Sequence, residues 1–118
     1  MKIINPDDEK ELKNFYQEWY SCYTSRNPVE PPSIATMRIL YQYATDGGVP
    51  GDYITAILQN DLYGVYGCAP LEELPLIYGT VQYVAVRMDV AAYGSSEKVG
   101  KWINKQRKEK NGRKTTMY

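Results

Sequence analysis

The chain of 118 residues contains no histidine and only two cysteines, Cys22 and Cys68. Histidine is the commonest general base and the commonest protein ligand of zinc, so its absence excludes Ser–His and Cys–His nucleophilic pairs. The two cysteines are far apart in the sequence and do not have the spacing of a metal site. We expect two reduced, half-buried thiols in a cytosolic protein, with a single disulfide as the alternative.

Long apolar runs and phosphate-binding motifs are also missing. No stretch approaches the roughly 20 apolar residues of a membrane span, and residues 1–6 lack the apolar run of a signal peptide. The glycine pairs have neither the lysine nor the spacing of a P-loop. Acidic pairs occur at residues 7–8 and 72–73, but both stand at predicted helix starts, where capping explains them. We therefore expect a cytoplasmic, non-enzymatic protein without a cofactor, a metal or a membrane partner.

Tyrosine makes up an unusual share of the apolar residues. The chain has twelve Tyr and two Trp but only one Phe, within an ordinary hydrophobic content of 43%. Because each phenol needs a partner or water, many of these rings are expected at the boundary between core and solvent. They serve either as core filler, which is the commoner use, or as a binding patch, because rigid rings lose little entropy on contact.

The net charge of zero conceals two segments of opposite sign. Residues 1–97 carry six Lys or Arg and thirteen Asp or Glu, a net charge of −7. Residues 98–118 carry eight Lys or Arg and one Glu, a net charge of +7. Such segregation favours a polyanion or an acidic protein surface as partner of the basic segment, and a basic surface as partner of the body.

Apolar residues at three- and four-residue steps predict helices along most of the chain. The first opens at residues 5–6 (Asn-Pro), which suit the cap and the first helical position, and ends near Arg26. The proline-rich residues 27–32 follow as a stiff, non-helical connector. A second helix begins after the capping residue Ser33 and stops at residues 46–48, Asp-Gly-Gly.

A third helix is predicted from Pro50 to Gly67. Residues 71–88 satisfy both helical spacing and the alternation of a strand. Since a single strand would have no partner in this chain, we predict a helix there, and its apolar surface on nearly all sides makes it the most buried one. The last helix begins at the serine pair 95–96 and is anchored to the body by Trp102.

These helices predict an all-α fold. We expect a compact orthogonal bundle of about five helices over residues 1–110, with a flexible basic tail at residues 111–118. The expected core includes Leu12, Phe15, Trp19, Ile34, Met37, Leu40, Ile54, Ile57, Leu58, Leu62, Leu74, Ile77, Val81, Val84, Val99, Trp102 and Ile103.

The glycine pair at residues 47–48 suggests a DNA-binding helix-turn-helix, with residues 51–62 as the recognition helix. Its charge argues against this, because it has Asp52 and Asp61 and no basic residue, so that phosphates would repel it. The C-terminal segment is the better candidate for contacts with phosphate groups or an acidic partner. Its basic residues are Lys98, Lys101, Lys105, Arg107, Lys108, Lys110, Arg113 and Lys114. A solvated helix end whose cations complement the helix dipole is an equally good interpretation.

Three segments resemble a set of small uncharacterised proteins of phages and prophages: GVPGDYITAILQNDL at residues 48–62, LPLIY at 74–78 and YGSSEKVGKWI at 93–103. Together they span about the second half of the chain. The resemblance implies a helix after a Gly-Pro turn, a final helix anchored by tryptophan, and an accessory protein of viral or mobile-element origin. It carries no assigned functional residues. By analogy, such small proteins often bind and modulate host proteins, including defence complexes.

The absent catalytic chemistry, the tyrosine content and the segregated charges together predict a non-enzymatic accessory protein that binds and modulates a host protein complex. A phage-encoded protein of this kind would act in the host cell cytoplasm. The alternative is a nonspecific nucleic-acid-binding protein that uses the basic C-terminal helix. The opposite charges of body and tail also allow self-association, with a homo-oligomer as the result.

Overall fold

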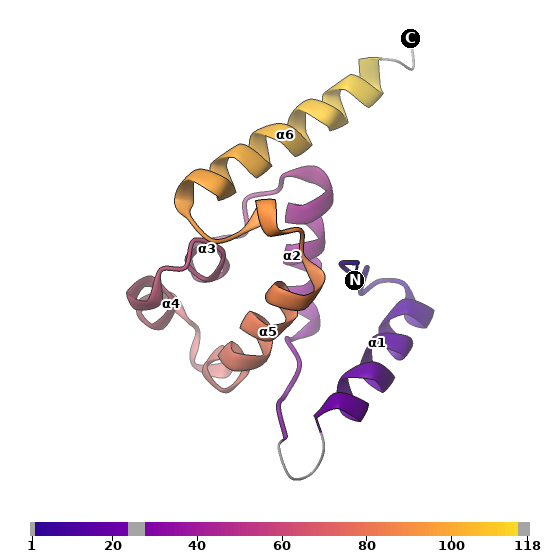
Figure 1. Cartoon of the computed structure of the whole chain (residues 1–118), viewed down its shortest axis with the longest axis vertical. Coiled ribbons are helices and arrows are strands. Elements are labelled where there is room, and N and C mark those ends of the chain that lie inside the picture. The colour runs from indigo at the N-terminus through magenta and orange to yellow at the C-terminus, as the bar shows by residue number, and fades with distance from the viewer. Residues whose placement is uncertain (1, 24–27, 116–118) are drawn as a thin grey trace.

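The computed structural model describes residues 2–23 and 28–115, and all regular structure in these ranges is helical. The predicted all-α fold is thus confirmed. In Figure 1, α1 lies on one side of α2 and α5, α3 and α4 lie on the other, and α6 runs across one end. In chain order the elements are α1 (Glu9–Cys22), α2 (Ile34–Asp46), α3 (Asp52–Leu58), α4 (Leu62–Cys68), the 3-10 segment η1 (Leu71–Leu76), α5 (Ile77–Arg87), the 3-10 segment η2 (Val90–Ala92) and α6 (Ser96–Thr115).

Local capping places the start of α1 one turn later than predicted. The Asp8 carboxylate accepts two backbone N–H groups of the first helical turn, at 3.1 and 3.2 Å. The predicted cap, Asn5, instead accepts a hydrogen bond from the backbone N–H of Asp7 at 3.0 Å, in the turn before the helix. The helix ends at Cys22, and the predicted end near Arg26 lies outside the described residues.

The second helix forms as predicted. Ser33 accepts a hydrogen bond from the backbone N–H of Thr36 at 3.2 Å, and Gly47 closes the helix in the left-handed conformation with φ of 69°. A Cβ at Gly47 would lie 2.7 Å from the carbonyl oxygen of Ile103. The glycine is therefore needed both for its φ and for the close approach of α6.

The predicted third helix is divided into α3 and α4 by a turn at residues 59–61. Asn60 adopts a left-handed φ of 61°, which asparagine tolerates better than most residues. The Asp61 carboxylate then accepts the backbone N–H of Gly64 at 3.0 Å and so caps α4. Leu62, which an unbroken helix would place in the core, is 65% exposed as a result.

Residues 71–88 are helical, as predicted, but they are not the most buried segment. Tyr83 and Val84 of α5 are buried, whereas Tyr78 and Val81 are exposed. The helix has more apolar surface than its neighbours cover. The prediction of core positions was wrong for Ile34, Leu62, Leu74 and Val81, which are exposed, whereas the other expected core residues are buried or partly buried.

Large side chains join α1, α2, α5 and α6 into one core. The Phe15 ring packs edge-on against the Tyr83 ring, with 5.5 Å between centroids. The Tyr43 hydroxyl donates to the carbonyl oxygen of Ala92 at 2.5 Å. The indole Nε1–H of Trp102 donates to the carbonyl oxygen of Tyr43 at 3.2 Å. Trp102 therefore anchors the last helix to the body, as predicted.

The last helix starts where predicted and runs further than predicted. Ser95 Oγ accepts a hydrogen bond from the backbone N–H of Lys98 at 3.2 Å and caps the first turn. The helix continues past Lys110 to Thr115, so the first part of the expected tail is helical, while residues 116–118 lie outside the described residues. Figure 1 shows the last turns of α6 extending beyond the other helices.

The proline-rich connector between α1 and α2 crosses α5 at a glycine. The indole Nε1–H of Trp19 donates to the carbonyl oxygen of Val29 at 2.7 Å, which ties the connector to α1. A Cβ at Gly79 would lie 1.8 Å from the carbonyl oxygen of Glu30. Since this is far below van der Waals contact, only glycine fits at this crossing.

We predict that Gly79→Ala lowers the free energy of unfolding by about 1–3 kcal/mol, because α5 or the connector must move. Gly100→Ala is the matched control, since Gly100 also lies in a helix and a Cβ there would meet nothing within 4 Å. The control should gain about 0.5–1 kcal/mol of stability. Urea unfolding followed by circular dichroism compares the two, and equal effects would contradict the close crossing.

A second prediction concerns alkaline pH. Burial raises the pKa of Tyr83 to about 12, and burial also raises the pKa of Tyr43. A tyrosine in the unfolded chain has a pKa of about 10. The stability that each buried phenol contributes is therefore complete below that pH and is lost as the pH rises toward the pKa of the folded state. We predict that the free energy of unfolding falls between about pH 10 and 12, and that Tyr83→Phe reduces the fall. Urea unfolding at several pH values measures this loss of stability. An equal loss in the wild type and in Tyr83→Phe would contradict the assignment to Tyr83.

Candidate functional site

Two of the eight basic residues predicted as contact residues, Arg107 and Lys110, bind the C-terminal end of α2. The Nε–H of Arg107 donates to the carbonyl oxygen of Gly47 at 3.1 Å, and Lys110 Nζ lies 3.9 Å from the carboxylate of Asp46. Both partners belong to the C-terminal end of α2. That end carries the partial negative charge of the helix dipole, so the two cations stabilise the packing of α6 against α2.

Four further lysines lie on the outer face of α6, as the sequence predicts. They are Lys98, Lys101, Lys105 and Lys108, and all four are exposed. Lys101 pairs with Glu97 one turn earlier at 2.9 Å, and Lys105 Nζ stands 5.4 Å from the ring centroid of Trp102. The side chains of Arg113 and Lys114 lie outside the described part of the structure. The described cations of α6 are thus divided between an internal and an external role.

We predict that Arg107→Ala lowers the free energy of unfolding by about 1 kcal/mol, because the α2 carbonyl loses a charged donor at a partly exposed site. Lys108→Ala, one residue further along the same helix, should change it by less than about 0.5 kcal/mol. Thermal and urea unfolding of both variants measure the difference. Equal effects would show that the contact of Arg107 with α2 contributes nothing.

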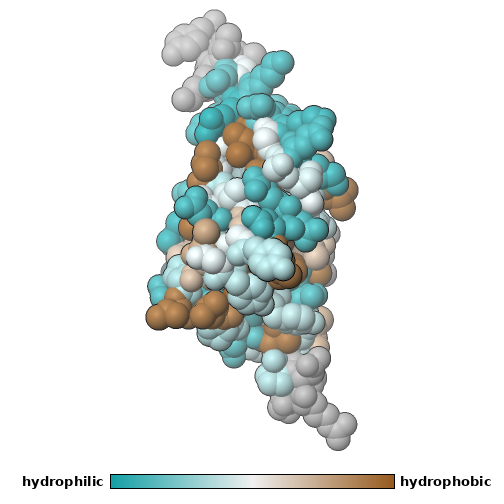
Figure 2. Space-filling view, turned by 90° about the vertical axis from the view of Figure 1, so that its left-hand side faces the viewer, coloured by the Kyte–Doolittle hydropathy of each residue, from teal (hydrophilic) through white to brown (hydrophobic). Residues whose placement is uncertain are grey.

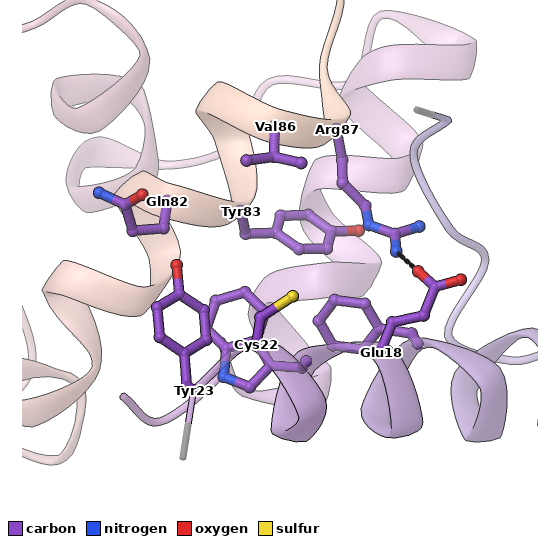
Figure 3. Close-up of a pocket in the computed structure, with 9 residues that line it drawn as sticks. Glu18, Cys22, Tyr23, Gln82, Tyr83, Val86 and Arg87 are labelled. Carbon is purple, nitrogen blue, oxygen red and sulfur yellow. Dashed lines mark hydrogen bonds and ion pairs between the residues drawn. The ribbon is translucent and has the colours of Figure 1, made fainter. Parts of the chain in front are cut away.

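A small cavity of about 110 Å³ lies between α1 and α5 (Figure 3). On one side, the Arg87 guanidinium pairs with the Glu18 carboxylate at 2.7 Å and stands 5.1 Å from the ring centroid of Phe15. On the other side, Figure 3 shows the ring of Tyr23, the residue that follows α1, directed toward Gln82 of α5. The remaining walls are Trp19, Cys22, Tyr83 and Val86. The one cation of the lining, Arg87, is thus already paired with Glu18 and links α1 to α5.

Both cysteines are free thiols and both are exposed, so the prediction of half-buried thiols was wrong. Among the residues that the structure describes, no group of three or more Cys, Asp or Glu is placed to hold a metal ion. The predicted capping role of Asp8 is confirmed, as described above. Glu73 of the second acidic pair accepts a hydrogen bond from the Ser33 hydroxyl at 2.9 Å.

A larger groove runs between the α3–α4 turn and α5. It consists of two adjoining hollows of about 350 and 240 Å³ that share Ile57, Asn60 and Val81, and we call it the α4–α5 groove. Tyr66 and Tyr78 lie at one end, and Tyr93 and Gly94 lie at the other. The other lining residues are Ala56, Asp61, Leu62, Val65, Ile77, Gln82, Val84 and Ala85.

The α4–α5 groove is mostly apolar and open to solvent. Leu62, Tyr66 and Tyr78 are each more than half exposed, and Val81 is 43% exposed. Figure 2, which looks onto the side that carries α3 and α4, shows hydrophobic side chains standing among hydrophilic ones on this face. Single exposed apolar residues are normal at a protein surface, but contiguous ones lining a groove are typical of an interaction site.

The sequence did not reveal this groove, because Leu62 and Val81, two of its exposed residues, were expected in the core. The signal that could have revealed it is a charge pattern. Residues 39–86 contain no Lys, Arg or His at all, over 48 positions that include five Asp or Glu. These residues build α3, α4, η1 and nearly all of α5, so both walls of the groove come from the cation-free stretch.

Comparisons of the chain with models of protein families, with curated protein sequences and with solved structures found no match. Among the described helices, none has both the length and the apolar character needed to cross a bilayer. The α4–α5 groove and the charges around it are therefore the features from which we infer a function.

Proposed function

We propose that this protein is a non-enzymatic binding protein that holds a segment of a partner protein in the α4–α5 groove. The observation that carries the proposal is the set of exposed apolar and aromatic side chains that line the groove, Leu62, Tyr66, Tyr78 and Val81, with the partly buried Tyr93 at its far end. Rigid aromatic rings in a preformed groove bind a partner with little loss of conformational entropy. A bound partner would thereby cover apolar surface that the described helices of the protein leave exposed.

The resemblance to small phage and prophage proteins guides the choice of partner. By analogy with that set, we propose a host protein complex as the partner, including a defence complex, and the host cytoplasm as the place of action. The alternative proposal is nonspecific binding of nucleic acid by the outer face of α6, where Lys101, Lys105 and Lys108 are exposed. The internal contacts of Arg107 and Lys110 reduce the number of cations left for that role.

The fourth prediction tests the groove directly with two substitutions on one helix. Val81 and Val86 are both exposed residues of α5, at 43% and 52%, but only Val81 lines the groove. Val81→Arg and Val86→Arg add the same charge and the same side chain to the same helix. We predict that, in nuclease-treated host lysate, Val81→Arg reduces capture of the dominant partner at least about tenfold, whereas Val86→Arg leaves it unchanged.

A third variant separates the two proposals. Lys101→Gln, Lys105→Gln and Lys108→Gln together remove three exposed cations from α6 without touching the groove. Under the leading proposal this variant captures the same protein as the wild type does. The nucleic-acid alternative makes three different predictions: capture is lost in the lysine variant, is abolished by nuclease and survives Val81→Arg. This set of results would contradict the groove proposal and support the alternative. Thermal unfolding of each variant confirms that it is folded.

A further inference from the structure

One acidic residue, Asp61, lines the α4–α5 groove, and no ion pair joins it to a cation among the residues that the structure describes. Of the five acids in residues 39–86, Asp46 pairs with Lys110 and Glu73 accepts from Ser33. The other three, Asp52, Asp61 and Glu72, are exposed. Asp61 itself lines the groove, beside Leu62 and Tyr66. An apolar groove with the Asp61 carboxylate at its edge favours a ligand that is apolar along one side and cationic beside it.

The charge of the groove is polarised along its length. At the end formed by Tyr93 and Gly94, Lys98 lies nearby, because its Nζ donates to the carbonyl oxygen of Val90 at 3.4 Å and approaches Gly94. Asp61 lies toward the opposite end, with Tyr66 and Tyr78. A ligand with cations would therefore place them at the Asp61 end and leave the Tyr93 end to apolar or uncharged groups.

The lining also distinguishes between a helix and an extended peptide. The groove offers few polar side chains besides Asp61, chiefly Asn60 and Gln82, to pair with backbone groups of a ligand. An extended segment would bury unpaired N–H and C=O groups against apolar walls, whereas a helix satisfies its own backbone. A helix also fits between the ridges of two helices, with residues at i, i+3, i+4 and i+7 as anchors.

The protein's own basic helix does not match these requirements. The exposed residues of α6 from Ser96 to Gly112 are all polar, charged or glycine, and its apolar residues face the body. The α6 helix of a second copy would bring cations to the groove but no apolar side chains to fill it. Anionic membranes and nucleic acids are disfavoured as well, because the Asp61 carboxylate would repel them. The occupant that fits the groove better is a segment of another protein that carries both apolar and cationic side chains.

We propose that the α4–α5 groove binds a cationic amphipathic helix of the partner protein, about three turns long to match the 11 residues of α5. An apolar stripe of that helix lies along Val81 and the tyrosines, and Lys or Arg residues beside the stripe lie at the Asp61 end. This inference rests on the proposed function and adds the chemical class of the partner.

Three labelled peptides of about 18 residues, measured by fluorescence anisotropy, provide the fifth prediction. The first has a Leu stripe at helical spacing flanked by Lys, the second has Glu in place of Lys, and the third keeps Lys but has Ser in place of Leu. We predict that the wild type binds the Leu–Lys peptide at least about tenfold more tightly than either of the others. Raising the salt concentration weakens that binding, because the charged groups lie at the surface.

Substitutions locate the binding of the Leu–Lys peptide. Val81→Arg weakens it at least about tenfold and Val86→Arg less than about twofold, although both change the net charge equally. Asp61→Asn weakens it about two- to fivefold through loss of charge, while asparagine keeps the cap on α4. Equal affinity for the Lys and Glu peptides, or equal effects of the two arginine variants, would overturn the inference. If groove-dependent capture of a lysate protein persists in that case, the proposed function stands and only the cationic helix is rejected.

Discussion

The conformation of residues 59–61 decides which apolar side chains of this protein reach solvent. The backbone N–H of Asn60 donates to the carbonyl oxygen of Ile57 at 3.1 Å, and that of Asp61 donates to the carbonyl oxygen of Ala56 at 2.9 Å. This pair of bonds, together with the left-handed conformation of Asn60, is the Schellman ending of a helix. It closes α3 while Leu58 is still in the core, and it turns α4 so that Leu62 faces outward.

The position of α5 follows from a different constraint. Gly79 lets the connector between α1 and α2 pack against one face of α5, and Tyr83 is buried in the core. The face with Tyr78 and Val81 stays exposed, because none of the described helices covers it. Together with the outward turn of α4, this uncovered face forms the α4–α5 groove.

The sequence was sufficient for the parts of the fold that depend on local signals. Ser33 and Gly47 mark the ends of α2, and Trp102 anchors α6, as their positions predicted. The wrong core positions came from apolar periodicity, which says that a residue such as Val81 belongs to an apolar face but not whether another helix covers that face. The division of the third helix had a visible cause, because Asn followed by Asp is a helix ending followed by a new cap.

The candidate site was predicted less well than the fold. The sequence directed attention to the basic C-terminal segment, yet Arg107 and Lys110 neutralise the end of α2, which only the three-dimensional packing reveals. The absence of cations from residues 39–86 was readable in the sequence. This absence becomes informative only in the folded protein, because both helical walls of the groove come from residues 39–86.

The central claim is that an apolar, acid-flanked groove between α4 and α5 is the binding surface of this protein. Nuclear magnetic resonance titration of the labelled protein with a cationic amphipathic peptide tests it most directly, because backbone amide shifts locate the contact residue by residue. The account predicts shifts that cluster at Asn60, Val81 and Tyr93 and leave the outer face of α6 unchanged. Shifts that cluster on α6, or in the cavity between α1 and α5, would contradict it.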